Sequence, residues 1–121
     1  MARILIVDDS PTETFRLKEI LGKNNHDIIE ASNGADGVTL AEIHVPDLIL
    51  MDVAMPGLNG FQATRYITQS ANTKHIPVII MSTKDQSIDE MWGKQQGAVD
   101  YLKKPLSEVI LLGTIQKYLE I

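Results

Sequence analysis

The chain has 121 residues, the usual size of one domain, which is long enough to bury a hydrophobic core. It has no cysteine, which excludes disulfides and thiolate metal sites, and its 11 basic and 16 acidic residues give a formal net charge of -5. No cluster of Lys or Arg interrupts this acidic balance, and the N-terminus lacks the apolar run of a signal peptide or membrane span. We therefore expect a cytoplasmic protein that neither binds nucleic acid nor inserts into a membrane.

Continuous apolar runs predict strands covered on both faces, as in the middle of a parallel sheet. Three such runs are Ile4–Val7, Leu48–Met51 and Pro77–Met81. Two shorter runs, Asp27–Ala31 and Asp100–Leu102, predict further strands, the first of them at an edge. Five strands are therefore expected.

Helical spacing and capping residues predict a helix after each strand. In the first, Ser10 is the expected N-cap, Pro11 the first helical residue, and Glu13 completes a capping box by reaching back. Ser107 is expected to cap the last helix. The apolar residues at helical spacing are Leu17, Ile20 and Leu21; Val38, Ala41 and Ile43; Phe61 and Ile67; Ile88, Met91 and Trp92; and Val109, Leu112, Ile115 and Leu119. Met91 and Trp92 could either cover the core or contact a partner.

Alternation of five strands with five helices predicts right-handed βαβ units, hence an α/β fold with a parallel sheet and helices on both faces. No repeat, low-complexity segment or linker divides the sequence. We expect residues 1–121 to form a single domain without an output domain.

Polar residues follow four of the predicted strands, where ligands bind in open α/β sheets. They are Asp8 and Asp9, Asp52, Ser82 and Thr83, and Lys104. Carboxylates about 4 Å apart repel by roughly 4 kcal/mol at an effective dielectric constant near 20, so three in one crevice require protonation or a cation. Magnesium binds carboxylates together with phosphate oxygens, which predicts a site for Mg²⁺ and phosphate.

Beside bound Mg²⁺, Asp52 could attack phosphorus and form an aspartyl phosphate. Lys104 could neutralise one phosphoryl oxygen, and the Ser82 hydroxyl could donate a hydrogen bond to another. Each residue alone would be an ordinary loop, capping or surface residue. Their joint occurrence at four strand ends favours the chemical interpretation.

The same positions carry a resemblance along the whole chain. The sequence resembles the receiver domain of two-component response regulators, the CheY-like family. The matching residues are Asp8-Asp9-Ser10, Asp52, Met55-Pro56-Gly57, Asn59-Gly60, Ser82, Gly97-Ala98 and Lys104-Pro105. The resemblance implies the flavodoxin-like (βα)5 fold, with strand order 2-1-3-4-5.

The resemblance also implies roles for individual residues. Asp52 would accept a phosphoryl group from a CheA-like histidine kinase or its phosphotransfer domain. Asp9, Asp52 and the backbone carbonyl of Ala54 would hold Mg²⁺, with Asp8 acting through water. Ser82 and Lys104 would contact the phosphoryl group, Tyr101 would change rotamer when Ser82 moves, and the Lys104–Pro105 bond would be cis.

A narrower resemblance is to the stand-alone PilH-type receivers of type IV pilus twitching-motility systems. It is carried by Ser10–Glu13, Gly57–Arg65, Ser82–Gln86 and Trp92–Ala98. It implies a monomeric phosphoacceptor that signals by protein contact through its fourth helix, fifth strand and fifth helix. Such a protein would be no enzyme beyond its own phosphorylation and dephosphorylation.

Other functions remain open at this point. The protein could drain phosphate from a kinase without any output. A haloacid-dehalogenase-like phosphatase would need an acid two residues after its nucleophile, where this chain has Ala54. A flavodoxin-like FMN protein is disfavoured by carboxylates at its phosphate-binding edge. Ala54 and Lys84 are expected to tune the phosphoryl lifetime, in a direction that the sequence does not give.

Overall fold

The computed structural model describes residues 2–83 and 86–119, and within these ranges five strands alternate with five helices. The strands are β1 (Arg3–Val7), β2 (Asp27–Ala31), β3 (Leu48–Asp52), β4 (Val78–Ser82) and β5 (Asp100–Lys103). The helices are α1 (Pro11–Lys23), α2 (Gly34–His44), α3 (Gly60–Gln69), α4 (Gln86–Gln95) and α5 (Glu108–Leu119).

All strand pairs are parallel, and the order in the sheet is β2-β1-β3-β4-β5. The predicted fold class and strand order are therefore confirmed. Every residue of β3 and β4 is buried, whereas β2 at the edge is partly exposed. The continuous apolar runs were thus a correct sign of central strands, because such strands are covered on both faces.

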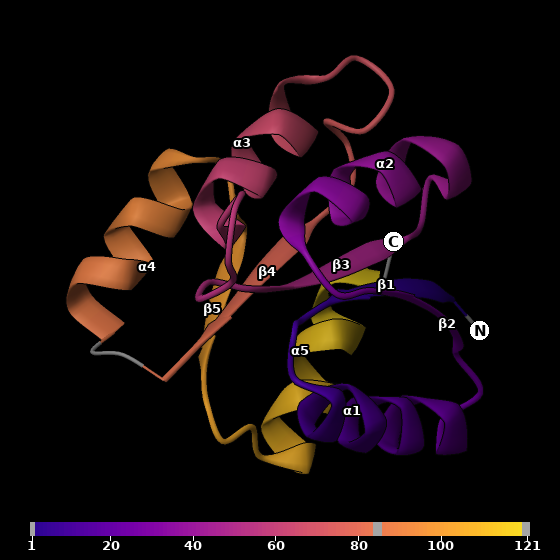
Figure 1. Cartoon of the computed structure of the whole chain (residues 1–121). Coiled ribbons are helices and arrows are strands. Elements are labelled where there is room, and N and C mark those ends of the chain that lie inside the picture. Colours follow the sequence, from indigo (N-terminus) through magenta and orange to yellow (C-terminus); the bar gives the residue numbers. More distant parts are fainter. Residues whose placement is uncertain (1, 84–85, 120–121) are drawn as a thin grey trace.

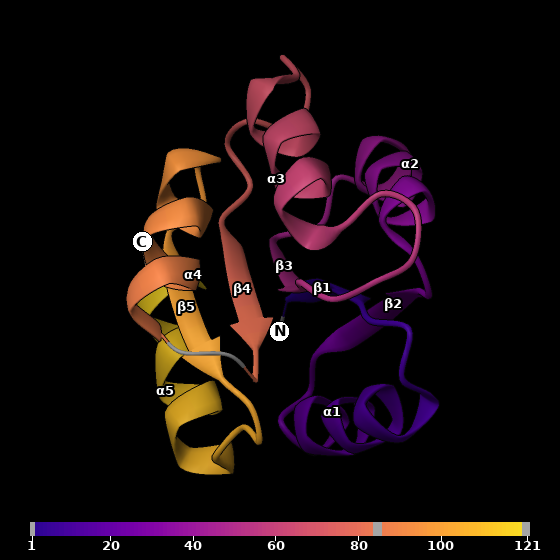
Figure 2. The same cartoon turned by 60° about the vertical axis from the view of Figure 1, so that its left-hand side comes forward.

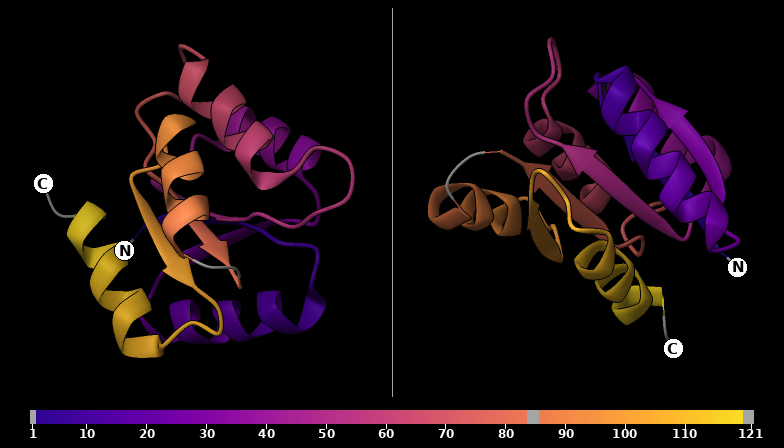
Figure 3. Two further views of the ribbon diagram at one scale, coloured as in Figure 1. Left: turned by 90° about the vertical axis from the view of Figure 1, so that its left-hand side faces the viewer. Right: turned by 90° about the horizontal axis from the view of Figure 1, so that it is seen from below.

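Two layers of helices cover the sheet, with α2, α3 and α4 on one face and α1 and α5 on the other (Figure 1; Figure 3, right). Side chains alternate between the layers along each strand. In β4, for example, Val78 and Ile80 pack in the cluster below α2 and α3, while Ile79 and Met81 pack with α1 and α5. Each face of the sheet therefore has its own hydrophobic core.

The ends of the helices follow the predicted capping residues in most cases. The Ser10 side chain accepts a hydrogen bond from the Glu13 amide at 3.3 Å, and Ser107 accepts one from the amide of Ile110 at 3.4 Å. The predicted capping box of α1 is wrong in its second half, because the Ser10 amide donates to Asp8 instead. One Glu13 carboxylate oxygen is buried without a hydrogen-bond partner among the described residues. The reciprocal pair occurs in α3, between Asn59 and Gln62.

Several apolar residues predicted to face the core lie on the surface. Ile43 is 65% exposed because α2 packs through its smaller residues Gly37 and Ala41. Val109 is 82% exposed because α5 is rotated so that Leu111 and Ile115 face the sheet.

The fourth helix also presents apolar side chains to solvent. Met91 and Trp92, whose role the sequence left open, are both about half exposed. The side chain of Ile88 lies outside the described residues.

Candidate functional site

Three carboxylates meet at the carboxyl ends of the two central strands, β1 and β3. Asp52 is the last residue of β3, while Asp8 and Asp9 directly follow β1, its neighbour in the sheet. One carboxylate oxygen of each residue lies within 4.8 Å of the others. Asp52 is only 5% exposed and Asp8 is also buried, whereas Asp9 faces solvent. The structure therefore brings together the three acidic residues selected from the sequence.

Lys104 bridges the two buried carboxylates from the loop that follows β5. Its Nζ lies 2.9 Å from Asp8 Oδ2 and 3.2 Å from Asp52 Oδ1. The Lys104 backbone amide donates to the Ser82 carbonyl at 2.7 Å, which fixes the start of this loop against β4. The Lys104–Pro105 peptide bond is cis, as predicted.

The charges in this cluster change the acidity of its members. Burial raises the pKa of Asp52 above its ordinary value of 3.8, the charge of Asp8 raises it further, and Lys104 opposes both. Burial alone would lower the pKa of Lys104, but its hydrogen bond to Asp8 and the charges of both carboxylates raise it overall. The crevice therefore favours the charged form of Lys104 and disfavours the charged form of Asp52.

The donor set fits a divalent cation. When ionised, three carboxylates and one ammonium group leave two negative charges in the crevice, which a Mg²⁺ ion would balance. The exposed Asp9 leaves the cluster open to solvent, so a bound ion could keep waters and accept phosphate oxygens. Ala54, whose carbonyl the resemblance implies as a further ligand, is exposed beside the cluster.

The glycine at the start of α3 holds the end of β3 close to the following loop. A Cβ atom on Gly60 would overlap the carbonyl oxygen of Asp52, and the Gly60 amide donates to the Val53 carbonyl at 3.1 Å. The helix can therefore begin directly over the last residue of the strand. This close approach positions the backbone that carries the Asp52 carboxylate.

Ser82 is placed differently from the acidic residues. In β3, Asp52 continues the row of Leu48 and Leu50, which packs toward α1 and α5. Ser82 continues the row of Val78 and Ile80, which packs toward the other helical layer. Its hydroxyl accordingly donates a 2.8 Å hydrogen bond to Oδ2 of Asp89 in α4.

Asp89 is a polar contact of the site that the sequence analysis missed. It is 8% exposed and belongs to the first turn of α4. An acidic residue in the first turn of a helix is usually explained by the helix dipole. Only the position of α4 over β4 shows that this carboxylate meets Ser82.

Of two further residues named from the sequence, Tyr101 lies within the described part of the chain. Tyr101 is buried at 7% exposure and packs in the same cluster as Val78, Ile80 and Ala98. The Tyr101 side chain is therefore already buried in this structure. The predicted rotamer change would have either this buried rotamer or another as its starting state. Lys84, expected to tune the phosphoryl lifetime, lies outside the described residues.

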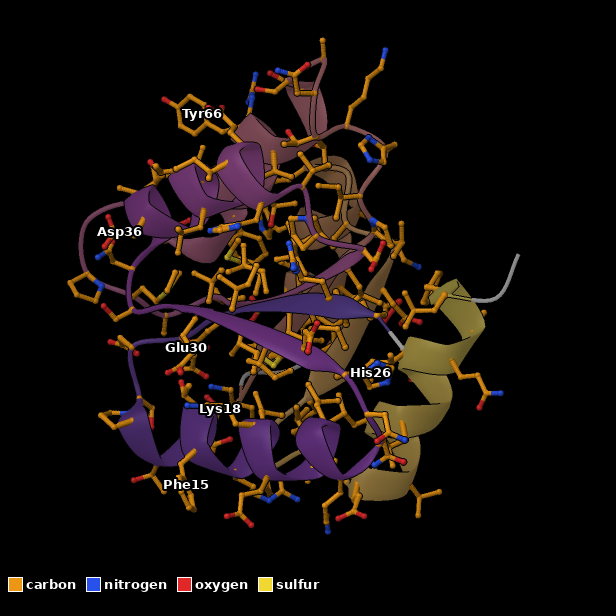
Figure 4. All side chains as sticks on the ribbon, turned by 90° about the vertical axis from the view of Figure 1, so that its right-hand side faces the viewer. Phe15, Lys18, His26, Glu30, Asp36 and Tyr66 are labelled. Carbon is orange, nitrogen blue, oxygen red and sulfur yellow. The ribbon has the colours of Figure 1, made fainter. Side chains whose placement is uncertain are left out.

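A groove of about 460 Å³ runs from the acidic cluster between α1 and the end of β2. Its lining includes Asp8, Asp9, Phe15, Lys18 and Glu30. Lys18 of α1 and Glu30 of β2 form an ion pair at 2.6 Å across it, and Phe15 projects from α1 into solvent (Figure 4). The groove gives the acidic cluster an open approach from this side.

No helix within residues 2–83 and 86–119 combines the length and the apolar character needed to cross a bilayer.

Comparison with known proteins identifies the family. Residues 4–116 match the response regulator receiver domain. The chain is 60% identical to Protein PilH of Pseudomonas aeruginosa PAO1 over 119 residues, 98% of each protein. The Vibrio cholerae chemotaxis protein CheY4 has a similar structure, with a TM-score of 0.92, 28% identity and 98% coverage of both chains.

A second solved structure bears on the metal. The receiver domain of the sensor histidine kinase PA1611 from Pseudomonas aeruginosa PAO1 has a TM-score of 0.91 and 30% identity, with 98% of this chain and 97% of that one covered. It is described with a magnesium ion coordinated in its active site cleft. Receiver domains are signalling proteins that bind Mg²⁺ at an acidic pocket, and this chain has such a pocket in Asp8, Asp9 and Asp52. By the family match, the identity to its relatives and the shared fold, the chain belongs to the response regulator receiver domain family.

Proposed function

We propose that this protein is a single-domain response regulator whose Asp52 accepts a phosphoryl group from a histidine kinase. The observation that carries the proposal is the placement of the Asp52 carboxylate at the end of a central strand, 3.2 Å from the Lys104 ammonium group and close to two more carboxylates. A nucleophile, a cation for a phosphoryl oxygen and ligands for a metal thus share one crevice.

In the proposed reaction, a carboxylate oxygen of Asp52 attacks phosphorus, the bond from phosphorus to the donor's imidazole nitrogen breaks, and that nitrogen recovers the bond's electron pair. Lys104 moves from bridging the two carboxylates to pairing with a phosphoryl oxygen. The Ser82 hydroxyl turns from Asp89 to donate to another phosphoryl oxygen. The charge that arrives at Asp52 is therefore neutralised by groups already in the crevice.

Asp9, Asp52, the Ala54 carbonyl and, through water, Asp8 would hold a Mg²⁺ ion. When bound, this ion supplies positive charge that lets an anionic donor approach the acidic crevice. Asp8 also helps to keep positive charge in the crevice, because its carboxylate pairs with the Lys104 ammonium group at 2.9 Å.

The donor and the pathway are proposed from the relatives. A CheA-like histidine kinase, or its phosphotransfer domain, would supply the phosphoryl group, and the system would be type IV pilus twitching motility in the cytoplasm. The identity of 60% to Protein PilH over nearly the whole of both chains supports this assignment. We propose that the protein acts as a monomer.

A contiguous side of the molecule is suited to pass the signal on. α4, β5 and α5 lie next to one another on this side (Figure 3, left). The two helices expose apolar side chains at Met91, Trp92, Val109 and Ile110, and Val99 adds another directly before β5. Exposed apolar groups in such number favour contact with a partner protein over a role that only drains phosphate from the kinase.

The test is the intact mass of the protein after incubation with Mg²⁺ and acetyl phosphate. We expect one added phosphoryl group, which is lost in the Asp52→Ala variant and in the presence of a chelator. An Asp9→Asn variant should form the adduct more slowly but on the same residue. A folded wild-type protein without an adduct, and without affinity for beryllofluoride, would refute the proposal.

A small phosphatase built on the same nucleophile is disfavoured. Such an enzyme needs an acid two residues after the nucleophile to protonate the leaving group, and Ala54 offers none. The expected reaction is therefore limited to phosphorylation and dephosphorylation of Asp52 itself.

A further inference from the structure

A buried carboxylate in α4 holds the hydroxyl group that the proposed reaction needs elsewhere. Asp89 is 8% exposed, and its Oδ2 accepts a 2.8 Å hydrogen bond from the hydroxyl of Ser82, which is itself buried. A hydrogen bond to a charged group is stronger than one between neutral groups. A buried carboxylate therefore competes effectively for this hydroxyl.

The contact follows from how α4 packs on β4. Gly93 of α4 lies against Ile80 of β4, where an added Cβ would be 3.2 Å from the Ile80 side chain. Asp89 is one helical turn before Gly93, and Ser82 is two strand residues after Ile80. One turn measures about 5.4 Å and two strand residues about 6.6 Å. Since a helix between parallel strands runs back along the sheet, the two steps coincide and bring the two side chains together.

The face of the sheet separates this pair from the acidic cluster. Asp52 continues the row of side chains that packs toward α1 and α5, and Ser82 continues the row that packs toward α4. The hydroxyl must therefore turn away from Asp89 before it can reach a phosphoryl group on Asp52.

We propose that Asp89 is a positioning residue that holds Ser82 in the unphosphorylated arrangement. Phosphorylation would then be a competition between two acceptors, the Asp89 carboxylate and the phosphoryl oxygens, for one hydroxyl hydrogen. This inference rests on the proposed function, because it assigns a cost to the movement of Ser82 that the phosphorylated state requires.

The competition also gives α4 a direct reason to respond. When Ser82 leaves, the Asp89 carboxylate loses this donor in a buried position, which is unfavourable unless water or another donor replaces it. Moving the first turn of α4 outward would admit water. Asp89 would thereby couple the state of Asp52 to α4 (Figure 2). This helix exposes Met91 and Trp92.

The test compares beryllofluoride binding, in the presence of Mg²⁺, by calorimetry for the wild type and for Asp89→Asn. Beryllofluoride occupies the phosphoryl position without a chemical step, so its affinity reports the cost of moving Ser82. The variant keeps the shape of the side chain but replaces the charged acceptor by a neutral one. We expect Asp89→Asn to bind about tenfold more tightly, equivalent to about 1.4 kcal/mol.

Glu90→Gln is the matched control. It makes the same change of charge one residue away, at a carboxylate that pairs with the exposed Lys94 at 3.3 Å. Its affinity for beryllofluoride should equal that of the wild type. If it binds as tightly as Asp89→Asn, the general charge of α4 is responsible and the proposal is wrong.

The decisive comparison is made in a Ser82→Ala background. Without the hydroxyl there is nothing for Asp89 to hold, so adding Asp89→Asn should leave the affinity unchanged. A tenfold gain that persists without Ser82 would show a structural effect of Asp89 and overturn the proposal, as would equal affinities of wild type and Asp89→Asn. Failure of the proposed function is distinguishable, because then neither wild type nor any variant would bind beryllofluoride in a manner that depends on Asp52.

Discussion

Asp52 combines two demands that conflict in the metal-free protein. In the proposed reaction its carboxylate must be charged to attack phosphorus, yet burial and the charge of Asp8 raise its pKa. The charged form is therefore less stable in the folded protein than in the unfolded chain. The proposed reactivity of this residue would therefore lower the stability of the folded protein, as in many functional sites.

Asp52→Asn should consequently stabilise the protein in the presence of a chelator. We expect the free energy of unfolding at neutral pH to rise by about 1 kcal/mol, measured by urea denaturation. The raised pKa gives the sign of the pH dependence: the gain is full above the folded pKa and is lost as the pH falls below 3.8, where the carboxyl becomes protonated in both states. A variant less stable than the wild type at every pH would contradict this explanation.

Lys104 should stabilise the folded protein, because its ammonium group pairs with two buried carboxylates. Lys104→Met should lower the free energy of unfolding by about 3 kcal/mol without metal, since it leaves buried charges unpaired. Lys18→Met is the control, because its ion pair with Glu30 is nearly half exposed and should contribute less than about 1 kcal/mol. Saturating Mg²⁺ should recover part of the loss in Lys104→Met only. An equal loss of unfolding free energy in both variants would show that the buried ion pairs of Lys104 contribute no more than an exposed one.

At the scale of elements, the close contact between the end of β3 and the start of α3 leaves no room for a side chain at Gly60. Gly60→Ala should lower the unfolding free energy by more than about 2 kcal/mol and slow adduct formation on Asp52, because the new methyl group meets the Asp52 carbonyl. Gly113→Ala makes the same change within α5, where, outside its chain neighbours and the helix's own backbone, no atom of the described residues lies within 4 Å of the added Cβ. That variant should gain about 0.5–1 kcal/mol. Adduct formation at the wild-type rate in Gly60→Ala would show that this close approach does not position Asp52.

The elements themselves could largely be predicted, because the strands are rich in apolar residues and α1, α2, α3 and α5 each begin after a capping residue. The orientation of the helices about their axes was harder. Val109 and Ile43 obey helical spacing, yet both are exposed. α5 buries Leu111, which was not on the predicted line, together with the predicted Ile115, and α2 packs through Gly37. Spacing defines a stripe, but which of two adjacent stripes is buried depends on the shape of the sheet surface below it.

At the scale of the whole molecule, metal binding and folding should be linked. Because the acidic cluster exists only in the folded chain, Mg²⁺ at 100 times its dissociation constant should add about 2.7 kcal/mol to the unfolding free energy. Asp9→Asn should weaken this response while leaving metal-free stability nearly unchanged, since Asp9 is exposed. A response to Mg²⁺ that is identical in Asp9→Asn would place the ion elsewhere.

The meeting of Asp8, Asp52 and Lys104 could be predicted because parallel strands end at one edge of a sheet. The contact between Ser82 and Asp89 could not, because it depends on how far α4 is displaced along β4. Rules for strand ends locate a site in the fold. They do not give the partners that a neighbouring helix contributes.

The alternation of side chains along β4 limits how this site can change over evolutionary time. Inserting or deleting one residue between Val78 and Ser82 would redirect Ser82, but it would also exchange the two layers to which Ile79 and Ile80 belong. The direction of the hydroxyl is thus inherited together with the core and cannot drift independently. A substitution in α4 does not exchange the core layers. Related proteins can therefore change how α4 responds to phosphorylation while β4 stays the same.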